Sequence, residues 1–337
     1  MARPDTVIVL VPGGMGTSLD LGSLEVWNSS TSALWMVLDP ALLLPWLPLT
    51  PVSLVPVYGD FLAFLGSQGY SQGNDNLYPF AYDWRQGLLY CSTALADFVK
   101  TRVEPNLAGR KILFLAHSYG CMVTRWAILL PLAAPLINNA LIRGIVAAGP
   151  PMLGIPSAFK NLVAAPDLGS LFYAVFQMTR FLFPALAEEV QVSINRALVA
   201  VTAQLECIPT YPILSGGSYT GPQPYSAFNW SGLPPELQTL INAVQQDLTA
   251  ITTAPWTGVV MTVFLSDTTP TDTGYILDPN DQLLLGLPPG PGDGTVPYQS
   301  AQAFSSASAN VVNLTYPHMT LFDDPVGRNF LINNGVI

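Results

Sequence analysis

Residues 111–131 read KILFLAHSYGCMVTRWAILLP, and this stretch decides the fold. Its first six residues form a short apolar run typical of a buried strand, and its last eleven have helical composition. Between them, Ala116-His117-Ser118-Tyr119-Gly120 places a small residue at each end of a turn centred on a serine. Strand, tight turn and helix in this order are the context of a nucleophile elbow, in which small neighbours let the strained serine backbone lift Oγ clear of the sheet. We therefore predict that Ser118 is a catalytic nucleophile.

Four more apolar, mostly β-branched runs predict strands, and helical patterns separate them. Residues 88–103, for example, carry apolar side chains at helical spacing. Strands that alternate with helices predict a mainly parallel sheet covered by helices on both faces. The four runs are Thr6 to Val11, Ile142 to Ala148, Val259 to Leu265 and Val311 to Leu314.

A serine hydroxyl needs a base to take its proton, and the chain has only two histidines. His117 adjoins the serine, and adjacent side chains on an elbow diverge, so it is badly placed for this role. His318 follows the last predicted strand, where a hydrolase with the order Ser, Asp, His carries its base. We therefore predict His318 as the general base.

The acid of such a triad precedes the histidine and lies in a loop after a late strand. Asp267 and Asp272 follow the run that ends at Leu265, and Asp293 lies in the string GDGTVP. Loop aspartates most commonly cap turns. We favour Asp293, because its glycine neighbours allow a sharp turn that aims the carboxylate inward, and we keep Asp267 as the alternative.

The tetrahedral intermediate of acyl transfer also needs hydrogen-bond donors for its oxyanion. One donor is normally the amide after the nucleophile, here that of Tyr119, and the other comes from a loop after an early strand. Residues 12–16, PGGMG, form such a loop, and we expect the Met15 amide to be the second donor; the alternative is a glycine-rich turn without a catalytic role. A phosphate-binding loop is excluded, because neither GxxxxGKS nor GxGxxG is present.

Composition indicates a globular protein with lipid-facing chemistry. Half of the 337 residues are hydrophobic, only 10% are charged, and the formal net charge is −10. An acidic surface repels phosphate backbones, so nucleic-acid binding is not expected. The sparse charge suggests an unusually apolar surface and a transient contact with a lipid interface.

The length fits one α/β core that carries an inserted cap. We assign residues 1–154 and 258–337 to the core and residues 155–257 to a cap, where the strand signal fades and residues 171–201 have helical patterns. An apolar, proline-rich segment, about 34–57, is expected to form a smaller cover. Its prolines exclude a transmembrane helix.

Cysteine and histidine counts indicate no zinc site, and we expect no metal and no cofactor; calcium held by carboxylates is the alternative that the sequence leaves open. Cys91, Cys121 and Cys207 lie far apart without a CxxC pair, so we expect free thiols. With two histidines, no zinc-hydrolase ligand set exists. The apolar stretch near the N-terminus is too short for a signal peptide, so the expected location is cytoplasmic if Met1 is the native start; secretion with a leader removed is the alternative.

Several motifs together resemble the lecithin:cholesterol acyltransferase-like family of α/β-hydrolases, which includes phospholipases and phospholipid:diacylglycerol acyltransferases. They match in order and spacing over residues 1–153 and 258–323. The motifs are VPGGMGTSL (11–19), Val26-Trp27, YDWR (82–85), AHSYG (116–120) and GDGTVP (292–297), with His318 trailing.

The resemblance implies the α/β-hydrolase fold, the triad Ser118, Asp293 and His318, and an oxyanion hole from the Met15 and Tyr119 amides. It implies a framework role for the YDWR string. The family's eukaryotic members have a disulfide-closed lid, but no cysteine lies between Val26 and Tyr58, so the chain departs from them there.

The expected function is a serine hydrolase that cleaves esters of apolar or lipid-like acids through an acyl-enzyme. One alternative is an acyltransferase that passes the acyl group to an alcohol, and a second is a catalytically silent binding protein of the same fold. Four aromatic residues in the apolar segments are candidate substrate contacts: Trp35, Trp46, Phe172 and Phe176.

Overall fold

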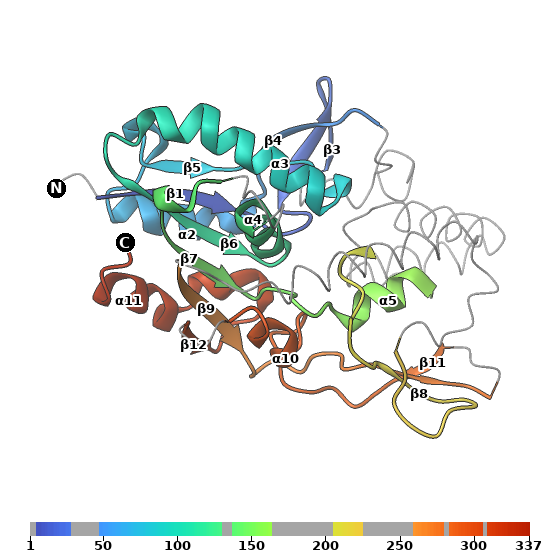
Figure 1. The fold of residues 1–337 in the computed structure, drawn as a ribbon. Coiled ribbons are helices and arrows are strands. Elements are labelled where there is room, and N and C mark those ends of the chain that lie inside the picture. The colour runs from blue at the N-terminus through green and yellow to red at the C-terminus, as the bar shows by residue number, and fades with distance from the viewer. Residues whose placement is uncertain are drawn as a thin grey trace.

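A single six-stranded sheet forms the centre of the computed structural model, which describes residues 5–27, 47–129, 137–163, 205–224, 259–279, 283–305 and 309–337. Its order is β12-β9-β7-β6-β1-β5, and every neighbouring pair is parallel (Figure 1). The five predicted strands are all present, within one residue at either end. The strands are β1 (Thr6–Val11), β5 (Leu77–Pro79), β6 (Lys111–His117), β7 (Ile142–Ala148), β9 (Val260–Ser266) and β12 (Asn310–Leu314).

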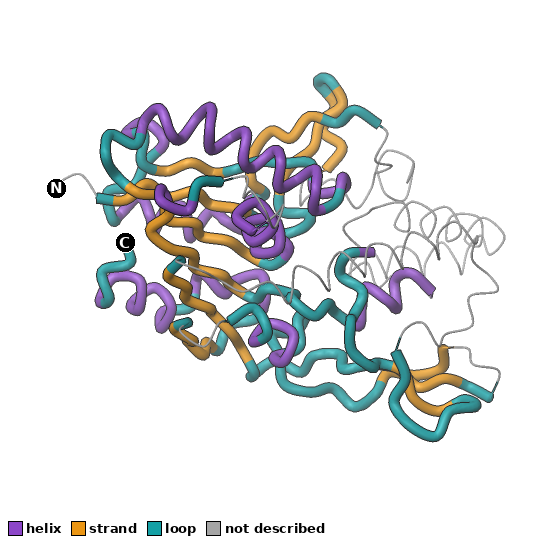
Figure 2. Tube along the Cα trace, viewed as in Figure 1, coloured by secondary structure: helices purple, strands orange, loops and turns teal. Residues whose placement is uncertain are grey.

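Helices cover both faces of this sheet, as the alternating strand and helix pattern predicts (Figure 2). All six residues of β1 are buried. Successive side chains of a strand point to opposite sides, so both faces of the sheet are covered at β1. Val7, Val9 and Val11 pack in the cluster that includes residues of α3 (Leu88–Phe98) and α4 (Tyr119–Leu129). Ile8 and Leu10 pack with α2 (Gly59–Ser67) and α11 (Pro325–Asn333).

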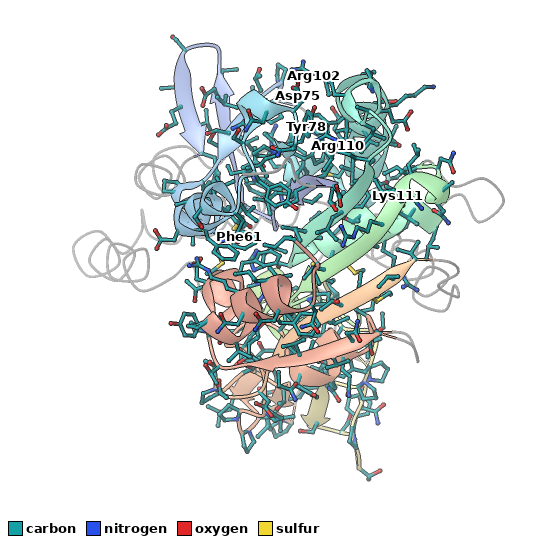
Figure 3. The ribbon with its side chains drawn as sticks, turned by 90° about the vertical axis from the view of Figure 1, so that its left-hand side faces the viewer. Phe61, Asp75, Tyr78, Arg102, Arg110 and Lys111 are labelled. Carbon is teal, nitrogen blue, oxygen red and sulfur yellow. The ribbon has the colours of Figure 1, made fainter. Side chains whose placement is uncertain are left out.

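The second face ties the C-terminal part of the chain to α2. Phe61 of α2 stacks on Phe322, with ring centroids 4.4 Å apart and planes 8° from parallel. Figure 3 shows Phe61 where α2 meets the C-terminal helices. Phe322 belongs to the short helix η10 (His318–Asp323), so this contact anchors the segment that begins with His318.

Two smaller sheets flank the central one, and the sequence patterns predict neither. Strand β2 pairs antiparallel with β3 and β4, and β10 pairs antiparallel with β11 and parallel with β8. The remaining elements are β2 (Thr17–Leu21), β3 (Leu24–Trp27), β4 (Thr50–Leu54), β8 (Leu214–Gly216), β10 (Tyr275–Leu277), β11 (Leu283–Gly286), α5 (Pro156–Val163), α10 (Tyr298–Gln302), η2 (Pro56–Tyr58), η3 (Gln72–Asn74), η4 (Trp84–Gln86), η5 (Val99–Val103), η6 (Glu104–Asn106) and η7 (Asn139–Leu141).

The predicted cap is described only in part. Residues 155–163 contain α5, residues 205–224 contain β8, and the helical pattern expected at 171–201 lies outside the described residues. Its boundaries therefore stay a prediction. Among the helices of the described ranges, none is both long and apolar enough to cross a bilayer.

The strand order creates a switch point between β1 and β6. From β1 the chain adds β5 on one side, whereas β7, β9 and β12 extend the sheet from β6 on the other side. In open parallel sheets, ligands bind at the carboxyl ends of the strands next to such a point. The loop of residues 12–16 follows β1 and Ser118 follows β6, so both candidate catalytic segments lie at this position.

Candidate active site

Ser118 occupies a strained turn between β6 and α4. Its φ is 52°, a left-handed conformation that residues other than glycine rarely adopt. The Ser118 amide donates to the carbonyl oxygen of Ala148 at 2.8 Å, which fastens the turn to the end of β7. At Gly120 a Cβ would lie 2.3 Å from the Pro12 oxygen, so only glycine fits there. This is the geometry of a nucleophile elbow.

The Asp293 carboxylate and the His318 ring form a buried pair. Oδ2 of Asp293 lies 2.7 Å from Nδ1 of His318, and the side chains are 2% and 5% exposed. The other oxygen, Oδ1, accepts hydrogen bonds from the amides of Thr295 (3.0 Å) and Val296 (2.7 Å). Burial alone would raise the pKa of Asp293, but the adjacent His318 and these hydrogen bonds outweigh it, and the pKa is lowered. The carboxylate is therefore ionised at neutral pH.

Glycines lie next to the Asp293–His318 pair at positions where a side chain would clash or strain the backbone. Gly292 and Gly294 flank the aspartate: a Cβ on Gly292 would lie 2.3 Å from Oγ1 of Thr271, and Gly294 has a φ of +92°. Gly149, at the end of β7, has a φ of +58°, and its Cβ would lie 2.8 Å from both Asp293 Oδ2 and His318 Nδ1. The sharp turn expected around Asp293 is thus present.

A second aspartate, which sequence patterns do not single out, holds the loop before His318. Asp324 is fully buried, and its Oδ2 accepts from the amides of Thr315 (2.8 Å) and Tyr316 (3.1 Å) and from the Thr315 hydroxyl (3.1 Å). Its Oδ1 accepts from the Val326 amide at 2.8 Å and so caps α11. The only signal in the sequence is an Asp-Pro pair at a helix start.

The loop after β1 contains a tight turn in which the amides of Gly14 and Met15 are available as hydrogen-bond donors. The Gly16 amide donates to the Gly13 oxygen at 3.0 Å, and Met15 has a φ of 64°, which fits the third position of a type II turn. Within the described chain, the amides of Gly14 and Met15 donate to no other group. Tyr119 is the first residue of α4, and its amide has no hydrogen-bond partner inside the helix. The helix dipole favours an anion at this N-terminal end.

Three aromatic side chains form hydrogen bonds with the backbone of this loop, and a fourth does so with Thr17, the first residue of β2. Their hydrogen bonds are Tyr82 Oη to the Pro12 oxygen (2.8 Å), Trp27 Nε1 to the Met15 oxygen (2.9 Å), Trp84 Nε1 to the Thr17 oxygen (3.3 Å) and the Gly13 amide to Tyr58 Oη (2.8 Å). Tyr82 and Trp84 belong to the YDWR string, whose Asp83 and Arg85 form a buried ion pair at 2.7 Å. The string therefore has a framework role.

His117 connects the elbow to the Asp293–His318 pair. Its Nε2 lies 2.8 Å from the backbone oxygen of His318, and the two imidazole rings are 4.8 Å apart. Among the contacts of the described residues, no hydrogen bond joins Ser118 to His318 itself. Catalytic hydrogen bonds are often long in unliganded sites and shorten when substrate binds.

Glu206 is another residue that sequence reasoning missed. Its carboxylate accepts a short hydrogen bond from the Tyr119 hydroxyl and, at 2.9 Å for each oxygen, contacts the amide of Leu88 at the start of α3. It therefore fastens the chain segment that starts at residue 205 to the helix behind the nucleophile. No local pattern signals this, because its partners lie 87 and 118 residues away.

Other predicted residues lie away from the pair or outside the described structure. Asp267 and Asp272 are exposed, and Tyr275 Oη donates to the latter. Cys91 and Cys121 are buried free thiols and Cys207 is a partly buried one; burial raises the pKa of all three, that of Cys207 to about 12. Across the part of the chain that the structure describes, no cluster of three or more His, Cys, Asp or Glu could hold a metal. The four candidate substrate contacts, Trp35, Trp46, Phe172 and Phe176, lie outside the described residues.

The fold and this arrangement define an α/β-hydrolase-fold protein, and the chain is similar to several solved structures. A chain in the crystal structure of the Tle4-Tli4 complex superimposes with a TM-score of 0.66 at 13% identity, covering 97% of each chain. The mature Bacillus licheniformis lipase BlEst2 matches with a TM-score of 0.39 at 13% identity, over 99% of this chain and 92% of that one. A lipase-esterase related protein from Clostridium acetobutylicum matches with a TM-score of 0.39 at 9% identity, over 99% and 92%.

Within this class, the model of the lecithin:cholesterol acyltransferase family matches residues 46–179, which is less than half of the chain. The resemblance that the motifs predict is thus confirmed. The matched segment holds YDWR and the serine elbow, and it ends before Asp293 and His318. No curated protein sequence matches the chain.

Proposed function

We propose that this chain is a serine hydrolase that cleaves carboxylic esters of apolar or lipid-like acids. The observation that carries the proposal is the buried Asp293–His318 pair, 2.7 Å apart, joined through His117 to a serine held in the left-handed conformation. Relationship to the lecithin:cholesterol acyltransferase family supports ester chemistry, and the low charge content supports an apolar substrate.

In the proposed mechanism, Ser118 Oγ attacks the ester carbonyl carbon while His318 Nε2 takes the hydroxyl proton. Asp293 accepts a hydrogen bond from the Nδ1–H group of His318 and stays ionised. This bond fixes the histidine tautomer and stabilises the imidazolium. The negative oxygen of the intermediate accepts hydrogen bonds from the amides of Met15 and Tyr119. The imidazolium then protonates the leaving alkoxide, which departs as an alcohol and leaves Ser118 acylated.

Hydrolysis of the acyl-enzyme repeats these steps with water. His318 takes one water proton, the resulting hydroxide attacks the acyl carbon, and the Ser118 oxygen recovers the proton as the acid leaves. An alcohol in place of water would give a new ester by the same steps. Acyl transfer therefore uses the same residues and differs only in the acceptor.

The first test is p-nitrophenol release from esters of increasing acyl length, with wild type compared with Ser118→Ala. Ser67→Ala is a matched control, because its hydroxyl is exposed and donates only to the Phe64 oxygen in α2. Turnover by wild type and by the control, but not by Ser118→Ala, supports the proposal. If Ser118→Ala retained full turnover, Ser118 would not be the nucleophile, and a chain inert on every ester would favour the silent binding protein.

Product analysis in the presence of an added primary alcohol separates hydrolysis from transfer. A hydrolase releases mainly free acid at modest alcohol concentration. An acyltransferase forms the new ester at a rate that exceeds its hydrolysis rate. The Ser118→Ala variant serves as the blank for non-enzymatic exchange in both arms.

A further inference from the structure

A chain of hydrogen bonds through His117 joins the loop after β1 to the backbone of His318. His117 is buried, with Nε2 2.8 Å from the His318 carbonyl oxygen and Nδ1 2.9 Å from Tyr58 Oη. A carbonyl oxygen can only accept, so Nε2 must carry a proton. Burial, and then the neighbouring His318, lowers the pKa of His117 to about 3, so the ring is neutral and Nδ1 is an acceptor.

Tyr58 completes the chain. Because Nδ1 of His117 accepts, the Tyr58 hydroxyl donates to it, and the same oxygen accepts from the Gly13 amide at 2.8 Å. Burial raises the pKa of Tyr58, so the hydroxyl keeps its proton. All the bonds therefore run in one direction: Gly13 amide to Tyr58 oxygen, Tyr58 hydroxyl to His117 Nδ1, and His117 Nε2 to the His318 oxygen.

The chain of hydrogen bonds ends at the proposed oxyanion loop on one side and at the backbone of the proposed general base on the other. Gly13 begins the turn that contains Met15, and a Cβ on Gly13 would lie 2.9 Å from the Ser118 Cβ. Because Tyr58 occupies the Gly13 amide, that amide does not compete with Met15 for an oxyanion. At the other end, the bond from His117 fixes the backbone of His318 and hence the origin of its side chain.

We propose that Tyr58 and His117 are positioning residues that couple the oxyanion loop to the general base. The inference rests on the proposed function and deepens it, because it assigns roles to two residues outside the triad. Catalytic groups must be held within about 0.5 Å of productive geometry. One neutral histidine, bonded on both sides, supplies that constraint to loop and base at once.

The first experiment is NMR of wild-type protein labelled with ¹⁵N-histidine. The chain has only two histidines, so the spectrum contains two rings, and Asp293→Asn identifies His318 by shifting its Nδ1 signal. We expect His117 as the neutral Nε2–H tautomer, unchanged from about pH 8 to about pH 5. A His117 ring that titrates in this range, or that carries its proton on Nδ1, would overturn the assignment. This result does not depend on enzyme activity.

The second experiment measures kcat and KM for Tyr58→Phe, which removes one hydroxyl and keeps the ring. We expect kcat to fall about 10- to 100-fold with KM little changed, less than the loss of a direct oxyanion donor. Tyr298→Phe is the matched control, since it removes a hydroxyl whose exposed hydrogen bond to Asn313 involves no member of this chain of bonds. A normal kcat in folded Tyr58→Phe would refute the coupling and leave the triad proposal intact.

A double-mutant cycle with His117→Leu tests whether the two residues act as one unit. If they do, the double variant loses no more kcat than the more damaged single variant. Losses that multiply would mean that the residues act independently and would contradict the proposal. Thermal unfolding of each variant confirms that folded proteins are compared, and the wild-type NMR result stands if His117→Leu does not fold.

Discussion

Gly149 provides a test of how closely the backbone approaches the Asp293–His318 pair. Its φ is +58°, and an added Cβ would lie 2.8 Å from Asp293 Oδ2, His318 Nδ1 and Leu321 Cδ1. We predict that Gly149→Ala lowers kcat by at least about 100-fold, because a misplacement of about 1 Å can have that effect. Steady-state kinetics on a short-chain ester would measure it.

Gly22→Ala is the control for the backbone cost. Gly22 has nearly the same φ, +62°, but nothing lies within 4 Å of the position of its Cβ. Both variants should lose about 1–2 kcal/mol of stability from the left-handed conformation, and only Gly149→Ala should also lose activity. Equal kinetics in the two would show that the pair tolerates the methyl group.

Asp293→Asn should reduce kcat much more than it changes stability. An amide cannot stabilise the imidazolium, and it favours the wrong tautomer of His318; in a serine protease the equivalent change lowers kcat about 10⁴-fold. We expect a loss of that order, measured by kcat at about pH 8. Asp267→Asn, which alters an exposed aspartate outside the pair, is the control, and comparable losses in both would contradict the assignment of the acid.

Sequence motifs predict Ser118, Asp293 and His318 as the triad, because each lies in a short string with a local turn requirement, and the structure shows the turns at Ser118 and Asp293. The same approach set His117 aside, since adjacent side chains on an elbow diverge. Its role depends on partners 59 and 201 residues away, and Tyr58 meets Gly13 across 45 residues. Contacts of that kind leave no periodic signal, so they could be found only in three dimensions.

At the scale of elements, Asp324 links the loop before His318 to α11. We predict that Asp324→Asn destabilises the protein by about 1–3 kcal/mol at neutral pH, because one carboxylate oxygen that accepts hydrogen bonds becomes an NH₂ group facing N–H or O–H donors. Urea unfolding of the two proteins would measure the difference. Gln299→Asn, an exposed change at a neutral side chain, should have little effect.

The sign of the pH dependence follows from the pKa of Asp324. Burial raises it, but the hydrogen bonds from Thr315, Val326 and Tyr316 prevail, and the pKa in the folded state is below its ordinary 3.8. The ionised carboxylate therefore adds stability that is fully present above pH 3.8 and is lost as the pH falls through the folded-state pKa. The difference between wild type and Asp324→Asn should shrink on acidification, and a difference that grows would contradict this account.

Strand prediction succeeded for strands that are buried on both faces, because these are continuous apolar runs. It failed for strands that form only through hydrogen bonds to a neighbouring strand. Strand β5 has only three residues and ends in Pro79, and β4 contains Pro51 within a proline-rich segment. Neither has a pattern of its own. Each forms because a partner strand, β1 or β2, offers an edge.

For the whole molecule, the net charge of −10 predicts how the substrate surface affects turnover. An anionic interface repels an acidic protein over the Debye length, about 30 Å at 0.01 M salt and about 3 Å at 1 M. We expect slower turnover of a neutral ester in anionic mixed micelles than in zwitterionic ones at low salt, with the two rates converging at high salt. A water-soluble ester measured at both salt concentrations controls for direct salt effects, and faster turnover on anionic micelles would contradict the prediction.

The order of the strands also has a consequence for synthesis on the ribosome. Translation produces all six central strands, and the predicted nucleophile Ser118, before it reaches His318. Domains fold as the chain emerges, at about 5–20 residues per second. Ser118 and His318 are 200 residues apart, so the elbow can form about 10–40 s before His318 is synthesised. During that time His117 lacks the His318 oxygen as a hydrogen-bond partner. If Ser118 and His318 act together as proposed, a nascent chain gains activity only after β12 and the segment that follows it have left the ribosome.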